Sequence, residues 1–124
     1  MSAASPIDAA IAAIKAKPGV TSDPVPRFPA VTMYKVMGKM FAILTVRGTP
    51  NVIVKCDPHL IEILRETYAG VGHRSHLDRR FWISVELESD VPPDEVARLI
   101  AGSYDLVCAG LTKKQKAALE ALSA

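Results

Sequence analysis

Short apolar blocks separated by turn residues dominate the middle of this chain. The blocks cover residues 31–36, 39–46 and 51–56 and are rich in β-branched and aromatic side chains. A two-residue turn and a four-residue turn separate them, and such spacings are typical of antiparallel hairpins. The pattern therefore predicts three consecutive strands.

A further strand is predicted over residues 81–88, where apolar and polar side chains alternate at every second position. Trp82 falls on the face opposite the apparent core. It would serve there either as an exposed aromatic platform or as partly buried packing, and we expect packing. The polar stretch 71–80 is expected to hold a short strand and to end in a basic loop.

Four segments combine helical spacing of apolar residues with a start signal. The first is predicted over residues 6–17, and the second ends near Gly70. In chain order the start signals are Ser5-Pro6, Asp57-Pro58, Pro92-Pro93 and the capping-box pair Thr112 and Gln115. The segment from Thr21 to Pro29 contains three prolines and is predicted to be an extended connector.

The predicted order is helix, three strands, helix, two strands and two helices. The simplest fold that buries these patterns is α+β, a two-layer α/β sandwich with a mostly antiparallel sheet of about five strands and helices packed on one face. At 124 residues and 49% hydrophobic content, residues 1–124 are expected to form a single domain with its core over about 18–119. A Rossmann-type fold is disfavoured.

The net charge of +2 hides a strong asymmetry along the sequence. Residues 27–80 hold nine basic side chains against four acidic ones, whereas residues 81–105 hold six acidic side chains against one basic one. A dipolar chain of this kind can steer an anionic partner onto one face or orient self-association. The alternative is that folding disperses these charges over an ordinary surface.

Membrane insertion and oxidised cysteines are both disfavoured. No stretch approaches the roughly 20 apolar residues that span a bilayer, and the alanine-rich start lacks the pattern of a secretory signal. We expect a soluble cytoplasmic protein with no membrane partner. Cys56 and Cys108 each lie inside an apolar run, so we interpret them as packing residues rather than as a disulfide or a reactive thiol.

A search for catalytic or metal-binding patterns assigns no catalytic residue. His73 and His76 could supply two metal ligands, but no cysteine or carboxylate stands at a recognised ligand spacing. The glycines near residue 71 lack a phosphate-loop pattern, and no nucleophile-elbow motif surrounds Ser75 or Ser103. We therefore expect a protein that is not an enzyme and that uses neither cofactor nor metal.

Basic residues on the predicted strands and loop are the strongest candidate site. Lysines from three neighbouring strands and arginines from the following loop could neutralise phosphates, with an aromatic ring available for stacking. The candidate nucleic-acid-binding residues are Lys35, Lys39, Lys55, Arg74, Arg79, Arg80 and Trp82. The alternative is structural: lysines protect strand edges from aggregation, and arginines commonly pair with carboxylates.

Several segments together resemble the MmcQ/YjbR family, with a match from about Pro18 to Leu119. They are Tyr34 to Ala42, the turn from Val54 to Pro58, Trp82 in its strand, Ser103 to Val107, and Leu111 to Lys114. The resemblance implies a CyaY-like two-layer fold that is also related to secretion chaperones, and a predicted DNA-binding role attributed to a double-wing arrangement. The lysines at 35, 39 and 55 and the aromatic residues at 82 and 104 match family positions. Iron binding, which a CyaY-like fold raises, is discounted because the first helix carries only Asp8.

Two functional hypotheses follow. In the first, the chain binds double-stranded DNA through its basic sheet and loop, with weak sequence preference and steep salt dependence. In the second, it is a protein-interaction or chaperone-like module, for example a homodimer, that acts through a sheet edge or dimer interface without binding nucleic acid. That association would tolerate salt.

Overall fold

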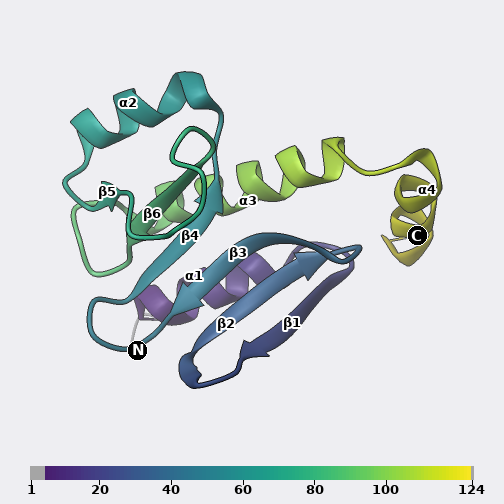
Figure 1. Cartoon of the computed structure of the whole chain (residues 1–124), viewed down its shortest axis with the longest axis horizontal. Helices are drawn as coiled ribbons and strands as arrows, with labels where there is room; N and C mark the ends of the chain where they lie inside the picture. Colours follow the sequence, from purple (N-terminus) through teal and green to yellow (C-terminus); the bar gives the residue numbers. More distant parts are fainter. Residues whose placement is uncertain (1–4, 124) are drawn as a thin grey trace.

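The computed structural model describes residues 5–123, which form an open antiparallel sheet with helices beside it (Figure 1). Across these residues the sheet has six strands in the order β1-β2-β3-β4-β6-β5. The strands are β1 (Val20–Val25), β2 (Phe28–Val36), β3 (Lys39–Thr45), β4 (Asn51–Lys55), β5 (Val71–Gly72) and β6 (Trp82–Glu86). The helices are α1 (Pro6–Lys15), α2 (Pro58–Thr67), α3 (Pro93–Ala109) and α4 (Lys113–Ser123). None of the described helices combines the length and apolar character needed to cross a bilayer.

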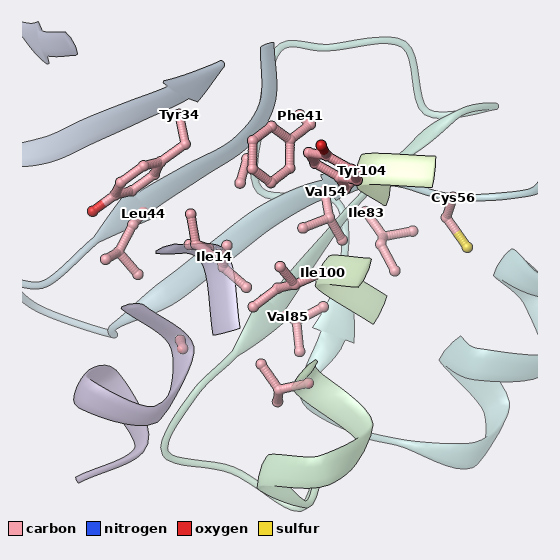
Figure 2. Packing of buried hydrophobic residues seen from close by; sticks show 14 of the residues in the cluster. Ile14, Tyr34, Phe41, Leu44, Val54, Cys56, Ile83, Val85, Ile100 and Tyr104 are labelled. Atoms are coloured by element: carbon pink, nitrogen blue, oxygen red, sulfur yellow. The ribbon is translucent and has the colours of Figure 1, made fainter. Parts of the chain in front are cut away.

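The core lies between one face of the sheet and the layer formed by α1 and α3 (Figure 1). Ile14 of α1 and Ile100 of α3 are fully buried against alternate residues of the strands, such as Val54. Figure 2 shows Phe41 beside Tyr104, with ring centroids 5.4 Å apart in an edge-to-face arrangement. The predicted two-layer α+β fold is therefore confirmed.

Three predicted helix starts are present as side-chain caps. The Ser5 hydroxyl accepts a hydrogen bond from the Asp8 amide at 3.1 Å, and the Asp57 carboxylate accepts one from the His59 amide at 2.9 Å. At α4, the Thr112 hydroxyl and the Gln115 side chain each accept a hydrogen bond from the other residue's amide, at 3.1 and 3.0 Å. This reciprocal pair is the capping box that the spacing predicted.

The predicted connector from Thr21 to Pro29 is wrong, because this segment forms β1 and the start of β2. Strand β1 pairs with β2 alone, so it is an edge strand, and proline is tolerated there because one side of the strand needs no ladder hydrogen bond. The register shifts between Pro24 and Val25, and Arg27 turns the chain with φ of 71°. The sheet therefore has one more strand than the sequence predicted.

Ser103 of α3 connects β3 to β4 where direct pairing between the two strands stops. The last direct pair is Ala42 with Val54. One residue further, the Ser103 hydroxyl accepts a hydrogen bond from the Lys55 amide at 2.8 Å and donates one to the Phe41 carbonyl at 2.6 Å. Because this hydroxyl is fully buried, it completes the ladder and ties both strands to α3.

Both cysteines are free thiols, as expected for packing residues. Cys56 is buried and Cys108 is half-buried. Burial is the main cause that raises the pKa of the Cys56 thiol, and the neighbouring Asp57 carboxylate adds to it. The thiol is therefore neutral at physiological pH, whereas the reactive form of cysteine is the thiolate.

Candidate nucleic-acid interface

Four strands bring most of the candidate residues to one end of the sheet. Because neighbouring strands are antiparallel, the end of β2, the start of β3, the end of β4 and the start of β6 all lie at that end (Figure 1). Lys35 is paired with Met40, and Lys55 is paired with Trp82. We define the basic end by the candidate residues located there, which are Lys35, Lys39, Lys55, Arg79, Arg80 and Trp82.

The lysines of the basic end do not all lie on the same face. Lys35 and Lys55 alternate with core residues, so both lie on the face away from α1 and α3, two strands or about 10 Å apart. Lys39 is paired with Val36, whose side chain is buried in the core, so the register assigns Lys39 to the helix side. The positive charge therefore wraps around the end of the sheet instead of covering one flat surface.

Trp82 shares its face with Lys55 and is half-buried, which agrees with the predicted packing role. Its backbone carbonyl lies 3.3 Å from the His73 Nδ1 atom. The other aromatic residue singled out by the resemblance, Tyr104, is buried in the core. Tyr104 therefore contributes to packing.

Three of the six basic candidates are in ion pairs. Lys35 Nζ lies 3.2 Å from an Asp23 carboxylate oxygen, and an Arg80 guanidinium nitrogen lies 2.8 Å from Asp78. Hydrogen bonds from the Arg80 side chain are the main cause that lowers the pKa of Asp78 to about 2, so this pair is ionised at neutral pH. Both pairs are solvent-exposed, and exposed pairs contribute little to stability.

Arg74 does not belong to the basic end. Its amide donates to the Ser84 hydroxyl at 3.2 Å, and its guanidinium lies 3.4 Å from Glu86, the last residue of β6. Glu86 is at the opposite end of the sheet, so Arg74 reaches away from the other candidates.

Further lysines that the sequence analysis did not select lie near the basic end. Lys17 precedes β1, whose first residue pairs with Val36, and its ammonium group lies 5.8 Å from the centre of the Tyr104 ring. Helix α4 reaches the same region because a Cβ on Gly19 would stand 2.6 Å from a Leu119 methyl group. The lysines that α4 brings there are Lys113, Lys114 and Lys116. Sequence blocks could not reveal this grouping, because it depends on where both termini pack.

Acidic residues gather at the opposite end of the sheet, which we call the acidic end and define by Glu86, Glu88, Asp90 and Asp94. Glu86 ends β6, and the others lie in or next to the connection to α3. The Asp90 carboxylate accepts hydrogen bonds from the Ala69 and Gly70 amides at 2.7 and 2.8 Å, and these bonds lower its pKa. The basic and acidic blocks of the sequence thus lie mostly at two ends of one sheet. The exceptions are Arg27, Arg47 and Arg74 near the acidic end, and Asp23 and Asp78, which are paired with residues of the basic end.

The surface has two hollows beside α2. One, which we call the arginine hollow, measures about 490 Å³ and lies between α2 and the residues that precede β6. Its lining residues are Pro58, Ile61, Glu62, Arg65, His73, Arg79, Arg80 and Phe81. The other, the α2–α3 groove, measures about 420 Å³ and is bordered by the exposed side chains of Leu60, Ile63 and Leu106.

A metal site finds no support in the part of the chain that the structure describes, residues 5–123, because no three histidine, cysteine or acidic side chains come together there.

Comparisons with known proteins place this fold among relatives of low sequence identity. The YjbR family model matches residues 15–106. The chain is 28% identical over 89 residues to the uncharacterized protein YbdF of Escherichia coli O157:H7. The matched region covers 71% of this chain and 73% of that protein. It is 32% identical over 74 residues to the uncharacterized protein YjbR of Escherichia coli K12. That matched region covers 59% of this chain and 63% of the other protein.

Solved structures share the fold. The DR2400 protein of Deinococcus radiodurans, described as a DUF419 domain, superposes with a TM-score of 0.77 at 27% identity, covering 88% of this chain and 83% of that one. A Pseudomonas syringae protein superposes with a TM-score of 0.62 at 24% identity, covering 70% of this chain and 86% of that one. These relatives support the two-layer fold.

Proposed function

The chain belongs to the YjbR family, and from this membership and the basic end of its sheet we propose that it binds DNA with weak sequence preference. The observation that carries the proposal is the convergence of Lys39, Lys55 and Arg79 from separate elements at one end of the sheet. The structure describes no ion pair for any of these three side chains.

The geometry favours contacts with the phosphate backbone over base readout. Lysine ammonium groups are point charges that neutralise phosphates, and such contacts position a protein without reading sequence. Lys17 and the lysines of α4 extend the same charge, so several phosphates along one strand could be contacted together. We therefore expect binding that depends steeply on salt.

The acidic end supports this orientation. A duplex that approaches the acidic end meets Glu88 and Asp94, whereas the basic end attracts it. Because positive and negative charges are separated along the strand direction, the field of the DNA would orient the molecule with its basic end toward the duplex before contact.

Fluorescence anisotropy with a labelled random-sequence duplex, measured from roughly 50 to 200 mM salt, tests the proposal. We expect affinity to fall by orders of magnitude over this range. Replacing Lys39 and Lys55 by glutamine should reduce the salt slope by about 2, because each lost phosphate contact removes about 0.9. The control, Arg27→Gln with Arg47→Gln, removes the same charge elsewhere and should leave the slope unchanged. Absence of wild-type binding at the lowest salt, or equal effects of the two pairs, would contradict the proposal.

A second function, association with a protein, is favoured by the α2–α3 groove. Leu60 and Ile63 are 48% and 58% exposed on the same helix, next to Leu106 of α3 at 38%. Contiguous exposed apolar side chains commonly mark interaction surfaces. Sedimentation at low salt and at roughly 0.5 M salt, where charge contacts are screened, tests self-association. A salt-tolerant dimer that Ile63→Glu dissociates would support this function, and a monomer at both salt concentrations would oppose the homodimer.

A further inference from the structure

We infer that the arginine hollow holds one unpaired nucleotide, so that the nucleic acid preferred by this chain is single-stranded. The inference rests on the proposed function, because it names the class of nucleic acid that the basic end would bind. The hollow opens directly beside the basic end, since Arg79 and Arg80 belong to both.

The floor of the hollow is apolar. Pro58 and Ile61 of α2 line it together with Phe81, which is 37% exposed. A surface that only neutralised phosphates would not need this apolar area. A nucleobase has flat apolar faces that such a floor can cover.

Arg80 and Phe81 form a stacked pair at the edge of this floor. The Arg80 guanidinium carbon lies 5.4 Å from the centre of the Phe81 ring, and Asp78 holds the same guanidinium through Nε and a terminal nitrogen at 3.1 and 2.8 Å. Bases in single strands stack on aromatic rings and on guanidinium planes. Asp78 therefore holds the Arg80 guanidinium over the Phe81 ring, and both groups are of the kind on which a base can stack.

Cations for the phosphate lie on the rim. Arg79 is exposed, and no ion pair is described for it within residues 5–123. Within residues 5–123, the ion pair described for Arg65 is with Glu62, which also lines the hollow, at 3.2 Å, and it is an exposed pair of the kind that contributes little. Both guanidinium groups can therefore bind a phosphate next to the stacked base.

His73 adds a polar group to the wall of the hollow. Its Nδ1 lies 3.3 Å from the Trp82 carbonyl oxygen, which can only accept a hydrogen bond. A hydrogen bond between these two atoms requires the proton on Nδ1, and in that tautomer Nε2 is an acceptor. A donor on the edge of an unpaired base, such as the N3–H group of thymine, is a suitable partner for this acceptor.

Size and access favour an unpaired base over a duplex. The volume of about 490 Å³ falls within the range of about 300–1,000 Å³ typical of sites for one small ligand. Bases in a duplex are stacked on each other and would leave the apolar floor empty. A single strand can place one base in the hollow and its phosphates on the basic end.

The test compares a labelled single strand of about 12 thymidine nucleotides with the corresponding duplex at one salt concentration. We expect the single strand to bind at least about fivefold more tightly. Arg80→Lys keeps the charge but removes the planar guanidinium, so it should weaken single-strand binding about fivefold and weaken duplex binding, which uses Arg80 only as a charge, by a smaller factor. Arg74→Lys makes the same exchange outside the hollow and should change neither. Phe81→Leu should act like Arg80→Lys.

Three results would overturn the inference. Equal wild-type affinity for single strand and duplex would reject it while leaving DNA binding intact, as would an equal effect of Arg80→Lys on both. Binding of neither nucleic acid at roughly 50 mM salt would reject the proposed function as well. Arg80 is highly exposed, so its variant tests the inference even if Phe81→Leu fails to fold.

Discussion

The two ends of the sheet use their charges differently. At the acidic end, the Asp90 carboxylate binds the Ala69 and Gly70 amides and so holds the connection between α2 and β5. At the basic end, no comparable local contact is described for the ammonium groups of Lys39 and Lys55. One end has a carboxylate that stabilises the fold, and the other has cations that are available to a ligand.

This difference separates structural charge from functional charge. A carboxylate that accepts two backbone hydrogen bonds is fixed in place, so replacing it should affect stability first. A lysine without such partners can be replaced at little cost to the fold. Variants at the two ends should therefore have different effects on binding and on stability.

The largest expected effect comes from reversing charge at the basic end. The triple variant Lys39→Glu, Lys55→Glu and Arg79→Glu replaces attraction to phosphates by repulsion, and duplex affinity should fall about a thousandfold at low salt. Anisotropy measures this loss. The matched control reverses three basic residues outside the basic end, Arg27, Arg47 and Arg74. If both triples weaken binding equally, only net charge matters and the comparison between the ends fails.

Ser103→Ala should destabilise the fold more than single changes at Asp90 or Thr112. It leaves the Lys55 amide and the Phe41 carbonyl without their buried partner, and unpaired buried groups cost about 1–3 kcal/mol each. We expect a loss of about 3 kcal/mol in the free energy of unfolding and a Tm lower by about 10 °C. Chemical denaturation measures the first and calorimetry the second. Ser103→Thr, which keeps a hydroxyl, should recover part of the loss, and an unchanged Tm in Ser103→Ala would refute the bridging role.

Asp90→Asn should lower the Tm by less than Ser103→Ala and should leave DNA binding unchanged. The folded state lowers the pKa of Asp90, so the stabilisation is present above the ordinary carboxyl pKa of 3.8 and is lost as pH falls toward the lowered value. The difference in Tm between wild type and variant should therefore be full at pH 7 and shrink below about pH 4. A difference that stays constant with pH would show that the charge of Asp90 is irrelevant.

The smallest effect is expected at the start of α4. Thr112→Ala removes the hydroxyl that accepts from the Gln115 amide, and loss of such a cap typically costs about 1 kcal/mol. Thermal unfolding and amide exchange in α4 would detect it. Thr67→Ala is a matched control, since that hydroxyl bonds to the Ile63 carbonyl within the same helix. Because α4 carries three lysines beside the basic end, faster exchange there should accompany slightly weaker DNA binding.

Local signals in the sequence were sufficient to predict much of the fold. The turns at residues 37–38 and 47–50 separate three strands as expected, and the caps at Ser5, Asp57 and Thr112 begin their helices. These features depend on neighbouring residues, so one sequence is enough to predict them. Strand β1 was missed because its prolines are unfavourable in a strand interior, and only its position at the edge of the sheet makes them acceptable.

The candidate site was predictable in part. The lysines at 35, 39 and 55 could be assigned to neighbouring strands. The face of the sheet on which Lys35 and Lys39 lie, however, depends on the register shift between Tyr34 and Lys35. The arginine hollow brings Arg65 of α2 beside the residues before β6, a contact between distant segments that no local pattern predicts. Arg74 was included because it lies close to Arg79 in sequence, whereas its actual partner is Glu86.

The Ser103 link makes one backbone amide a probe of motion in the whole domain. The Lys55 amide can exchange its proton with solvent only when α3 moves away from the sheet, because its hydrogen-bond acceptor belongs to that helix. Its exchange rate should therefore follow the detachment of α3 and not the fraying of β4. A ligand that binds across the basic end and restrains both elements would slow this exchange, so one resolved amide signal could report ligand binding without any label.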